Sequence, residues 1–336
     1  MHIVVLAGGN GKRLWPISNA TKPKQYIEFL NSEENSNKKC SMIQYIWKQL
    51  EDANLAKNSI ICTAENQVEI LQKQIEGATI VAEPCARGTF SAVALSSAFL
   101  KSKRNVSEDE TICVIPADTF TQASYFEILK TLPDVLEHSN ADVVIMGIKP
   151  NCPSSKYGYI VPKEQKDEYI KVDYFIEKPD EKTAKRLITQ NALWNCGVFC
   201  MKMNTIFKYC QKYDIFSDYD EMFKEYSKFP KISFDCEVLE NRKDNLSAVV
   251  FNGNWSDLGT WDSIVSNDLM KPQENVIMDK SCYNTHVINE LDIPVITMGA
   301  KNMIVVTTKE GILIADKSEY ENIKDVMDHL EKLQAK

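Results

Sequence analysis

A glycine-rich loop with two cations stands near the start of the chain, in the sequence LAGGNGKRLWP at residues 6–16. Glycine has no Cβ, so backbone N–H groups in such a loop can approach a polyphosphate, and Lys12 and Arg13 add positive charge. The loop is not a Walker A sequence, and Leu14 stands where a GxGxxG fingerprint has its last glycine. The pattern alone fits a phosphate-binding loop and a tight strand-to-helix turn about equally well.

Two lysines flank Pro23 in the sequence TKPKQY at residues 21–26. The proline ring restricts the backbone and so limits the directions in which Lys22 and Lys24 can point. Arg13 and Lys24 are therefore candidates to converge on one phosphate chain. Taken alone, the segment is better explained as a solvated basic loop.

Two aspartates are candidate metal ligands. Asp118 ends the apolar run ICVIPAD, and Asp257 lies in NWSDLGTW. Mg²⁺ takes one or two protein carboxylates and completes its shell with phosphate oxygens and waters. Either residue considered alone fits a helix N-cap as well, but their occurrence together with a phosphate loop favours a metal site.

An adjacent acid and base, Glu177 and Lys178, occur in FIEKP at residues 175–179. Neighbouring residues of a strand point to opposite faces, so both can serve one ligand only where the strand breaks, and Pro179 favours a break. Glu177 would then accept hydroxyl protons of a sugar while Lys178 binds a sugar phosphate. The alternative is a solvated strand end.

The elements that must position these residues alternate between strand and helix. Short apolar runs occur at residues 2–7, 59–64, 79–83, 111–118 and 141–148, with helix-like stretches between them. This alternation predicts an α/β sheet with helices on both faces and a ligand site at the carboxyl ends of the strands.

The rhythm changes after about residue 150. Antiparallel strands are expected at YGYIVPK, YIKVDYFIEKP and WNCGVFCMK, followed by a polar, aromatic-rich helical stretch at residues 203–228. The tail carries short β-rich runs and closes with an amphipathic helix. We expect a catalytic domain at residues 1–265 and a small C-terminal β/α domain at residues 275–336.

Composition excludes several classes of protein. The 336 residues are 44% hydrophobic and 26% charged, as in ordinary folded proteins. The net charge of −8 without a basic block argues against nucleic-acid binding. No apolar run approaches the ~18 residues of a membrane span, and the start lacks a signal peptide, so we expect a cytoplasmic protein with reduced cysteines. The four scattered histidines disfavour zinc sites and histidine triads.

The ordered set LAGGNGKRLWP, PKQY, EPCARGT, PAD, YGYI, FIEKP, WNCGVF and NWSDLGTW resembles the sugar-1-phosphate nucleotidyltransferases, and most of all the members that act on mannose 1-phosphate. The resemblance covers residues 1–262 in order, and the tail resembles the short C-terminal region of the same enzymes. It implies a Rossmann-like nucleotidyltransferase domain with a mixed, mainly parallel sheet, plus a small β-rich C-terminal domain that ends in a helix. It also implies Mg²⁺-dependent transfer of GMP from GTP to mannose 1-phosphate, which gives GDP-mannose and pyrophosphate.

The resemblance further implies roles for individual residues. The nucleotide-binding positions of the family correspond to Gly8, Gly9, Asn10, Gly11, Arg87 and Thr89. The positions that hold the sugar phosphate correspond to Gly158, Glu177, Lys178 and Asn195. The metal ligands correspond to Asp118 and Asp257, and the catalytic cations to Arg13, Lys24 and Lys178. The chain departs from the family pattern at Gly88, Phe90, Thr119 and Cys196.

Three alternatives remain open on the sequence. The first is a nucleotidyltransferase for another sugar 1-phosphate, such as heptose 1-phosphate. The second is a GT-A-like glycosyltransferase, for which Asp218-Tyr219-Asp220 supplies the Asp-x-Asp spacing, although its polar surroundings favour a solvated helix start. The third is a non-catalytic binding paralogue, which the retained charged residues disfavour. We expect no isomerase domain, and a homodimer formed through the tail is a further hypothesis.

Overall fold

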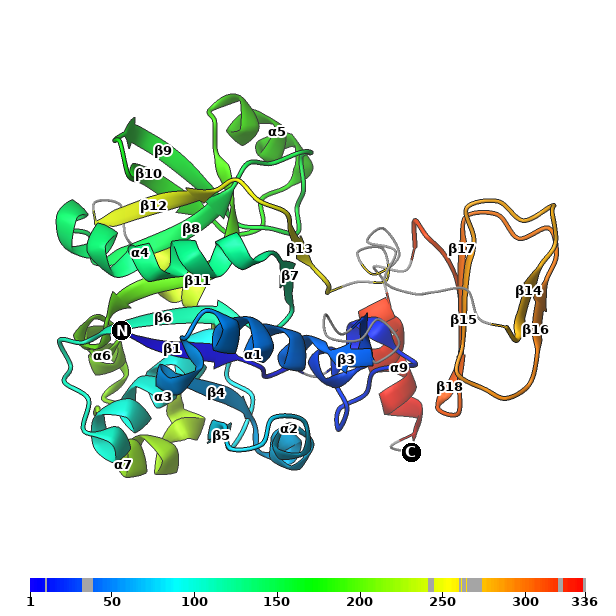
Figure 1. Ribbon diagram of the computed structural model, residues 1–336, viewed down its shortest axis with the longest axis horizontal. Coiled ribbons are helices and arrows are strands. Elements are labelled where there is room, and N and C mark those ends of the chain that lie inside the picture. Colours follow the sequence, from blue (N-terminus) through cyan, green and yellow to red (C-terminus); the bar gives the residue numbers. More distant parts are fainter. Residues whose placement is uncertain are drawn as a thin grey trace.

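The computed structural model describes residues 1–9, 11–31, 39–240, 245–259, 261, 264, 274–319 and 323–334, so the role expected of Asn10 lies outside the described residues. The main sheet is built from β1 (His2–Leu6), β4 (Ser59–Ala64), β5 (Thr79–Glu83), β6 (Thr111–Pro116), β8 (Val143–Ile148), β9 (Tyr159–Gln165), β10 (Ile170–Ile176), β11 (Leu193–Lys202) and β12 (Leu246–Phe251). Its nine strands lie in the order β5-β4-β1-β6-β11-β8-β12-β10-β9 (Figure 1).

Two strands run against the rest of this sheet. Strand β11 is antiparallel to β6, β8 and β9, and β10 is antiparallel to β9 and β12, whereas the other pairings are parallel. The sheet is therefore mixed and mainly parallel in strand direction. The strands expected at residues 59–64, 79–83 and 141–148 are confirmed to within two residues, as is the antiparallel pairing of β9 with β10.

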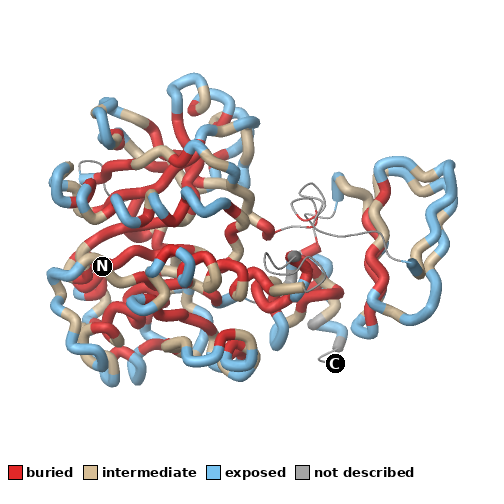
Figure 2. Tube along the Cα trace, in the orientation of Figure 1, coloured by how far each residue is buried: buried red, intermediate tan, exposed pale blue. Residues whose placement is uncertain are grey.

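Helices cover both faces of the sheet. One face carries α1 (Met42–Asp52), α2 (Val68–Gln74) and α4 (Ala123–Ser139), the other carries α3 (Thr89–Arg104), α6 (Met203–Cys210) and α7 (Tyr219–Lys224), and α5 (Glu181–Thr189) packs beside β9. Alternation along β1 divides the core: Ile3 and Val5 join the cluster under α1 and α4, and Val4 joins the cluster under α3. The buried sheet between exposed helix surfaces is visible in Figure 2.

Short antiparallel pairs and a tail complete the fold. The pairs are β2 (Glu28–Asn31) with β3 (Lys39–Ser41), and β7 (Thr119–Thr121) with β13 (Trp255–Asp257). The tail contains β14 (Val276–Met278), β15 (His286–Asn289), β16 (Val295–Thr297), β17 (Met303–Thr308), β18 (Gly311–Asp316) and the closing helix α9 (Ile323–Gln334). Helix α9 contacts the 3₁₀ turn η1 (Lys12–Leu14), which follows the glycine loop. Across the described ranges, no helix is long and apolar enough to cross a bilayer.

Candidate active site

Lys24 lies between the carboxylates of Asp118 and Asp257. Its Nζ forms an ion pair with Asp118 Oδ2 and lies 3.6 Å from Asp257 Oδ1. Asp118 follows the carboxyl end of β6, and Asp257 ends β13, where the pairing with β7 places it opposite Thr119. The 3₁₀ turn η2 (Lys24–Tyr26) carries the lysine. These three residues, the first cluster, lie at the edge where parallel strands present their ligand-binding loops.

The charges of the first cluster are only partly screened by solvent, since the Lys24 side chain is 18% exposed. Burial opposes the charge of Lys24, but Asp118 and Asp257 outweigh it and raise the Lys24 pKa. Burial also opposes ionisation of Asp118, yet Lys24 and then Arg13 hold its pKa below the usual range. At Asp257, burial and the Asp118 carboxylate together outweigh the charge of Lys24, so the pKa of this carboxyl group is raised. A further cation beside Asp257 would favour its ionised form.

The donor set of the first cluster fits Mg²⁺. Asp257 Oδ1 is buried and makes no hydrogen bond with a described residue. Asp118 and Asp257 supply hard oxygen ligands, and Mg²⁺ is commonly held by one or two carboxylates. Within the described parts of the chain, no group of three His, Cys, Asp or Glu side chains forms a metal cage made of protein alone. A cation here would therefore need oxygens from phosphate and water as well.

The glycine loop packs directly against the segment that carries Lys24. Gly11 has φ +65°, and a Cβ there would lie 2.8 Å from Pro23 Cα, so glycine is required on both counts. Gly8 and Gly9 are exposed just after β1, and Arg13 is exposed beyond them. The positive charge of Arg13 reaches the first cluster, as the lowered pKa of the Asp118 carboxylate shows after burial and Lys24 are counted. Loop and lysine thus form one cationic rim.

Glu177 and Lys178 meet on one side of the chain because the strand breaks between β10 and α5. Strand β10 ends at Ile176, and Lys178 has φ +46°, a left-handed conformation. The two side chains form an ion pair, which confirms the break predicted next to Pro179. A Cβ at Gly158 would lie 2.6 Å from Glu177 Oε2. Glycine at this position therefore makes room for the carboxylate.

Asn195 joins this group from β11. Its backbone N–H donates to Gly158 O at 2.8 Å, and its Oδ1 accepts from the Gly197 N–H at 2.9 Å. Gly197 in turn lies beside Pro116, the last residue of β6 and a near neighbour of Asp118. The structure thus brings Gly158, Glu177, Lys178 and Asn195 together as a second cluster. Strand β11 connects the second cluster to the first.

The predicted nucleotide contacts Arg87 and Thr89 stand at the start of α3. Thr89 Oγ1 accepts a hydrogen bond from the Phe234 N–H at 2.8 Å, and Arg87 O accepts one from the Ile232 N–H at 3.1 Å. Arg87 Nε is buried and lacks a hydrogen-bond partner among the described residues. Both residues therefore anchor the chain near residue 233.

Two carboxylates that were not predicted reach the second cluster from the π-helix η7 (Asp235–Leu239) and the residue after it. Asn195 Nδ2 donates to Asp235 Oδ1 at 2.7 Å, and the Glu177 N–H donates to Glu240 Oε1 at 2.8 Å. Burial, followed by the Glu177 carboxylate, raises the pKa of Asp235 to about 6. The only sequence signal was the acidic residues Asp235, Glu237 and Glu240, which alternate with apolar residues in SFDCEVLE.

Three of the departures from the family pattern have structural roles. Gly88 has φ +99°, and a Cβ there would lie 2.3 Å from Ile232 O. Phe90 is fully buried, and its ring packs edge-on against Phe229 at 5.8 Å between centroids. Cys196 is 2% exposed within the apolar core. These residues therefore serve packing.

The Asp-x-Asp sequence forms a helix start. Asp218 Oδ1 accepts the N–H groups of Asp220 and Glu221 at the beginning of α7, at 3.0 and 3.1 Å. Asp220 pairs with Lys103 at 2.7 Å. Both aspartates thus have structural partners, as the preferred interpretation of this sequence predicted, and the glycosyltransferase alternative loses its metal motif.

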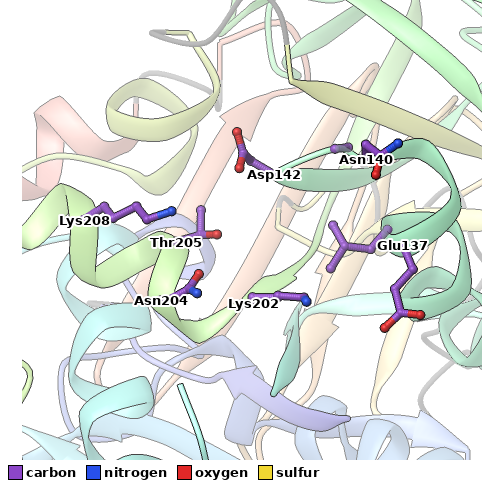
Figure 3. Close-up of a pocket in the computed structure, with 9 residues that line it drawn as sticks. Glu137, Asn140, Asp142, Lys202, Asn204, Thr205 and Lys208 are labelled. Carbon is purple, nitrogen blue, oxygen red and sulfur yellow. The ribbon is translucent and has the colours of Figure 1, made fainter. Parts of the chain in front are cut away.

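A pocket of about 390 Å³ opens at the opposite edge of the sheet (Figure 3). Asp142, just before β8, and Lys202, at the end of the antiparallel strand β11, lie on its wall together with Asn140, Asn204 and Lys208. Lys202 pairs with the first residue of β6, so the pocket lies at the amino ends of the parallel strands. It is therefore separate from the two clusters.

Known proteins share sequence and fold with this chain. The nucleotidyl transferase family matches residues 2–272. A mannose-1-phosphate guanylyltransferase of Escherichia coli is 29% identical over 98% of the chain and 75% of its own length. The mannose-1-phosphate guanylyltransferase RfbM of Salmonella typhimurium is 28% identical over 98% of the chain and 72% of its own length. A crystal structure described as mannose-1-phosphate geranyltransferase from Thermus thermophilus shares the fold, with a TM-score of 0.78 and 24% identity over 98% of this chain and 99% of its own.

Proposed function

The chain belongs to the nucleotidyl transferase family, and we propose that it transfers GMP from GTP to mannose 1-phosphate, forming GDP-mannose and releasing pyrophosphate. The two substrates are chosen from the names of the Escherichia coli and Salmonella relatives. The observation that carries the proposal is the meeting of two clusters at one edge of the sheet. The first pairs Lys24 with two carboxylates, and the second pairs Lys178 with Glu177 beside Asn195.

The nucleophile in this reaction comes from the substrate. A sugar 1-phosphate has a second pKa near 6, so it is mostly a dianion at neutral pH and needs no protein base. One of its oxygens attacks the α-phosphorus of the nucleotide, a new P–O bond forms, and the bond to pyrophosphate breaks. The task of the protein is to align two polyanions and neutralise their charge.

The cations of the site divide this task. Lys178 is 56% exposed at the strand break and orients the attacking phosphate. Lys24, between Asp118 and Asp257, neutralises charge on the α-phosphate, and Arg13 stabilises the departing pyrophosphate. The nucleotide contacts the loop and the start of α3 through Gly8, Gly9, Gly11, Arg87 and Thr89. The sugar contacts Gly158, Glu177 and Asn195.

Asp118 and Asp257 are the residues that would hold Mg²⁺. When bound, the ion supplies Lewis-acid neutralisation of phosphate oxygens. Asp257 Oδ1, which is buried and makes no hydrogen bond with a described residue, supports this assignment. In the structure Lys24 balances the same two carboxylates, which keeps the site from holding two unpaired negative charges.

A substrate panel with pyrophosphate release as the readout tests the proposal. The purified protein is incubated with Mg²⁺, each of the four common nucleoside triphosphates, and mannose, glucose or heptose 1-phosphate. We expect turnover to be fastest with GTP and mannose 1-phosphate. Faster turnover with another pair would replace the proposed substrates while keeping the reaction class. GTP binding without pyrophosphate release from any pair would favour a non-catalytic paralogue.

A further inference from the structure

The segment at residues 232–240 touches both halves of the proposed site. Its first part lies against the motif at the start of α3, through the hydrogen bonds from Ile232 to Arg87 and from Phe234 to Thr89. Its second part is the π-helix η7, closed by the Glu240 N–H donating to Asp235 O at 3.0 Å. π-Helical turns are rare and occur often at functional sites.

The two ends of this turn each hold one member of the second cluster. Asp235 Oδ1 accepts from Asn195 Nδ2 at 2.7 Å, at the start of the turn. Glu240 Oε1 accepts from the Glu177 backbone N–H at 2.8 Å, just past its end. Each bond therefore restrains one residue of the proposed sugar site, Asn195 or Glu177.

The Asn195 carboxamide is held at both of its polar atoms. Its oxygen accepts the Gly197 N–H at 2.9 Å, and its nitrogen donates one hydrogen to Asp235. These two bonds fix the plane of the amide and leave the second N–H of Nδ2 as a donor. Without Asp235, the amide would keep only one of its two restraints.

We propose that Asp235 and Glu240 are positioning residues for sugar recognition, acting through Asn195 and the Glu177 backbone. This inference rests on the proposed function, because it takes the second cluster to be the sugar-phosphate site. Charge-assisted hydrogen bonds are shorter and stronger than neutral ones, so a carboxylate suits the task of holding a neighbour still. The two residues are expected to tune binding of the sugar phosphate and to leave the nucleotide contacts unchanged.

Variants that remove or keep an acceptor oxygen separate positioning from folding. Asp235→Ala and Glu240→Ala remove the acceptor, whereas Asp235→Asn and Glu240→Gln retain one. We expect KM for the sugar 1-phosphate to rise about tenfold in Asp235→Ala, and less in the more exposed Glu240→Ala, with KM for the nucleotide and kcat within about twofold of the wild type. The amide variants should recover most of the lost affinity.

Asp218→Ala is the matched control, because Asp218 also accepts hydrogen bonds but caps the remote helix α7. It should lose stability and leave both KM values unchanged. An unchanged sugar KM in Asp235→Ala, or equal increases in both KM values, would overturn the inference. So would an Asp235→Asn variant that is folded yet no better than Asp235→Ala.

The wild-type panel keeps this inference apart from the proposed function. If the protein prefers another pair of substrates, the variants are compared with that pair. If no pair is turned over, titration calorimetry with mannose 1-phosphate, and then with the other sugar phosphates, measures the affinity of each variant without a reaction. Equal affinity of the wild type and Asp235→Ala in that titration, or binding by neither protein, would also contradict the positioning role.

Discussion

Lys24 is the residue whose position most constrains how the site works. Its ammonium group sits between two carboxylates that also form the fitting donor set for Mg²⁺. A lysine has a flexible four-carbon stem, so Nζ can turn from the carboxylates toward a phosphate. The sequence indicated each of these residues separately. Their meeting depends on the pairing of β7 with β13, which joins positions far apart in the chain.

Replacing Lys24 by alanine should impair chemistry, and it also leaves the Asp118 and Asp257 carboxylates without their cation. The variant removes a cation that balances the α-phosphate in the transition state, and we expect kcat to fall by about 10²–10³, as when one oxyanion donor is lost. Initial rates of pyrophosphate release at saturating substrates measure the effect.

The neighbouring lysine gives a matched control for this variant. Lys22 stands on the other side of Pro23 and is exposed, so Lys22→Ala should retain wild-type kcat. Equal losses in the two variants would show that the loop as a whole, and not the position of Lys24 between the carboxylates, matters.

The raised pKa of Asp235 predicts an unusual pH dependence of stability. Burial and then the Glu177 carboxylate raise its pKa to about 6, while Lys178 and Asn195 lower it by a smaller amount. A carboxyl group with a raised pKa in the folded state binds its proton more tightly there than in the unfolded chain. The wild type therefore loses stability as the pH rises from about 4 to about 6.

Asp235→Asn cannot ionise and should be more stable than the wild type above this range, by up to about 3 kcal/mol at pH 7, and equal to it near pH 4. Urea denaturation at pH 4, 5, 6 and 7 measures the difference. If the Asp235 carboxylate stabilised the fold at pH 7, Asp235→Asn would lower the free energy of unfolding there. A less stable Asp235→Asn variant at pH 7 would therefore contradict this account.

At the scale of elements, the sequence predicted the strand and helix alternation because each apolar run is local. The break after β10 was predictable for the same reason, since Pro179 follows Lys178 directly. The role of the π-helix η7 and of Glu240 after it was not predictable. The carboxylates of Asp235 and Glu240 meet their partners, Asn195 and Glu177, only in the folded chain. The sequence marked Gly88 only as a departure from the family pattern, because its need for glycine comes from a backbone carbonyl far along the chain, at Ile232.

Gly88→Ala should destabilise the fold more than an ordinary loop substitution. The new Cβ would lie 2.3 Å from Ile232 O, and the residue has φ +99°, so both strain and a backbone clash result. We expect a loss of about 3 kcal/mol or more in urea denaturation.

Gly77→Ala isolates the contribution of backbone strain to this loss. Gly77 also has a positive φ, +76°, but no atom lies within 4 Å of its added Cβ. Its alanine variant should cost only about 1 kcal/mol. Similar losses at the two positions would show that the contact with Ile232 O is relieved at little cost.

At the scale of the whole molecule, a chain with a net charge of −8 gathers cations where polyanions would bind. Arg13, Lys24 and Lys178 are presented by a glycine loop, a 3₁₀ turn and a strand break, and the two lysines have carboxylates of the same site beside them. A catalytic domain at residues 1–265 and a small β/α domain at residues 275–336 stay a prediction from the sequence. The composition argues against nucleic-acid binding but could not predict where the tail docks, because that contact is long-range.

The tail docks on the segment just after the glycine loop, which gives it a means to affect nucleotide binding. Thr308 Oγ1 donates to Pro16 O at 3.4 Å, and Gly311 packs against the Trp15 ring, where an added Cβ would lie 2.6 Å from Trp15 Cζ2. Trp15 stands two residues after Arg13. Movement of the ring should therefore disturb the cationic rim.

Gly311→Ala should raise KM for GTP about three- to tenfold, because small misplacements of positioning groups are costly even when they originate far from the chemistry. Gly299→Ala is the control: Gly299 lies in the same tail with φ +66°, but its added Cβ would meet no atom within 4 Å. Initial rates at varied GTP, with the sugar phosphate saturating, give the two KM values. If both variants bind GTP as the wild type does, the tail contact supports the fold without influencing the loop. If both weaken GTP binding equally, strain within the tail and not contact with Trp15 is responsible.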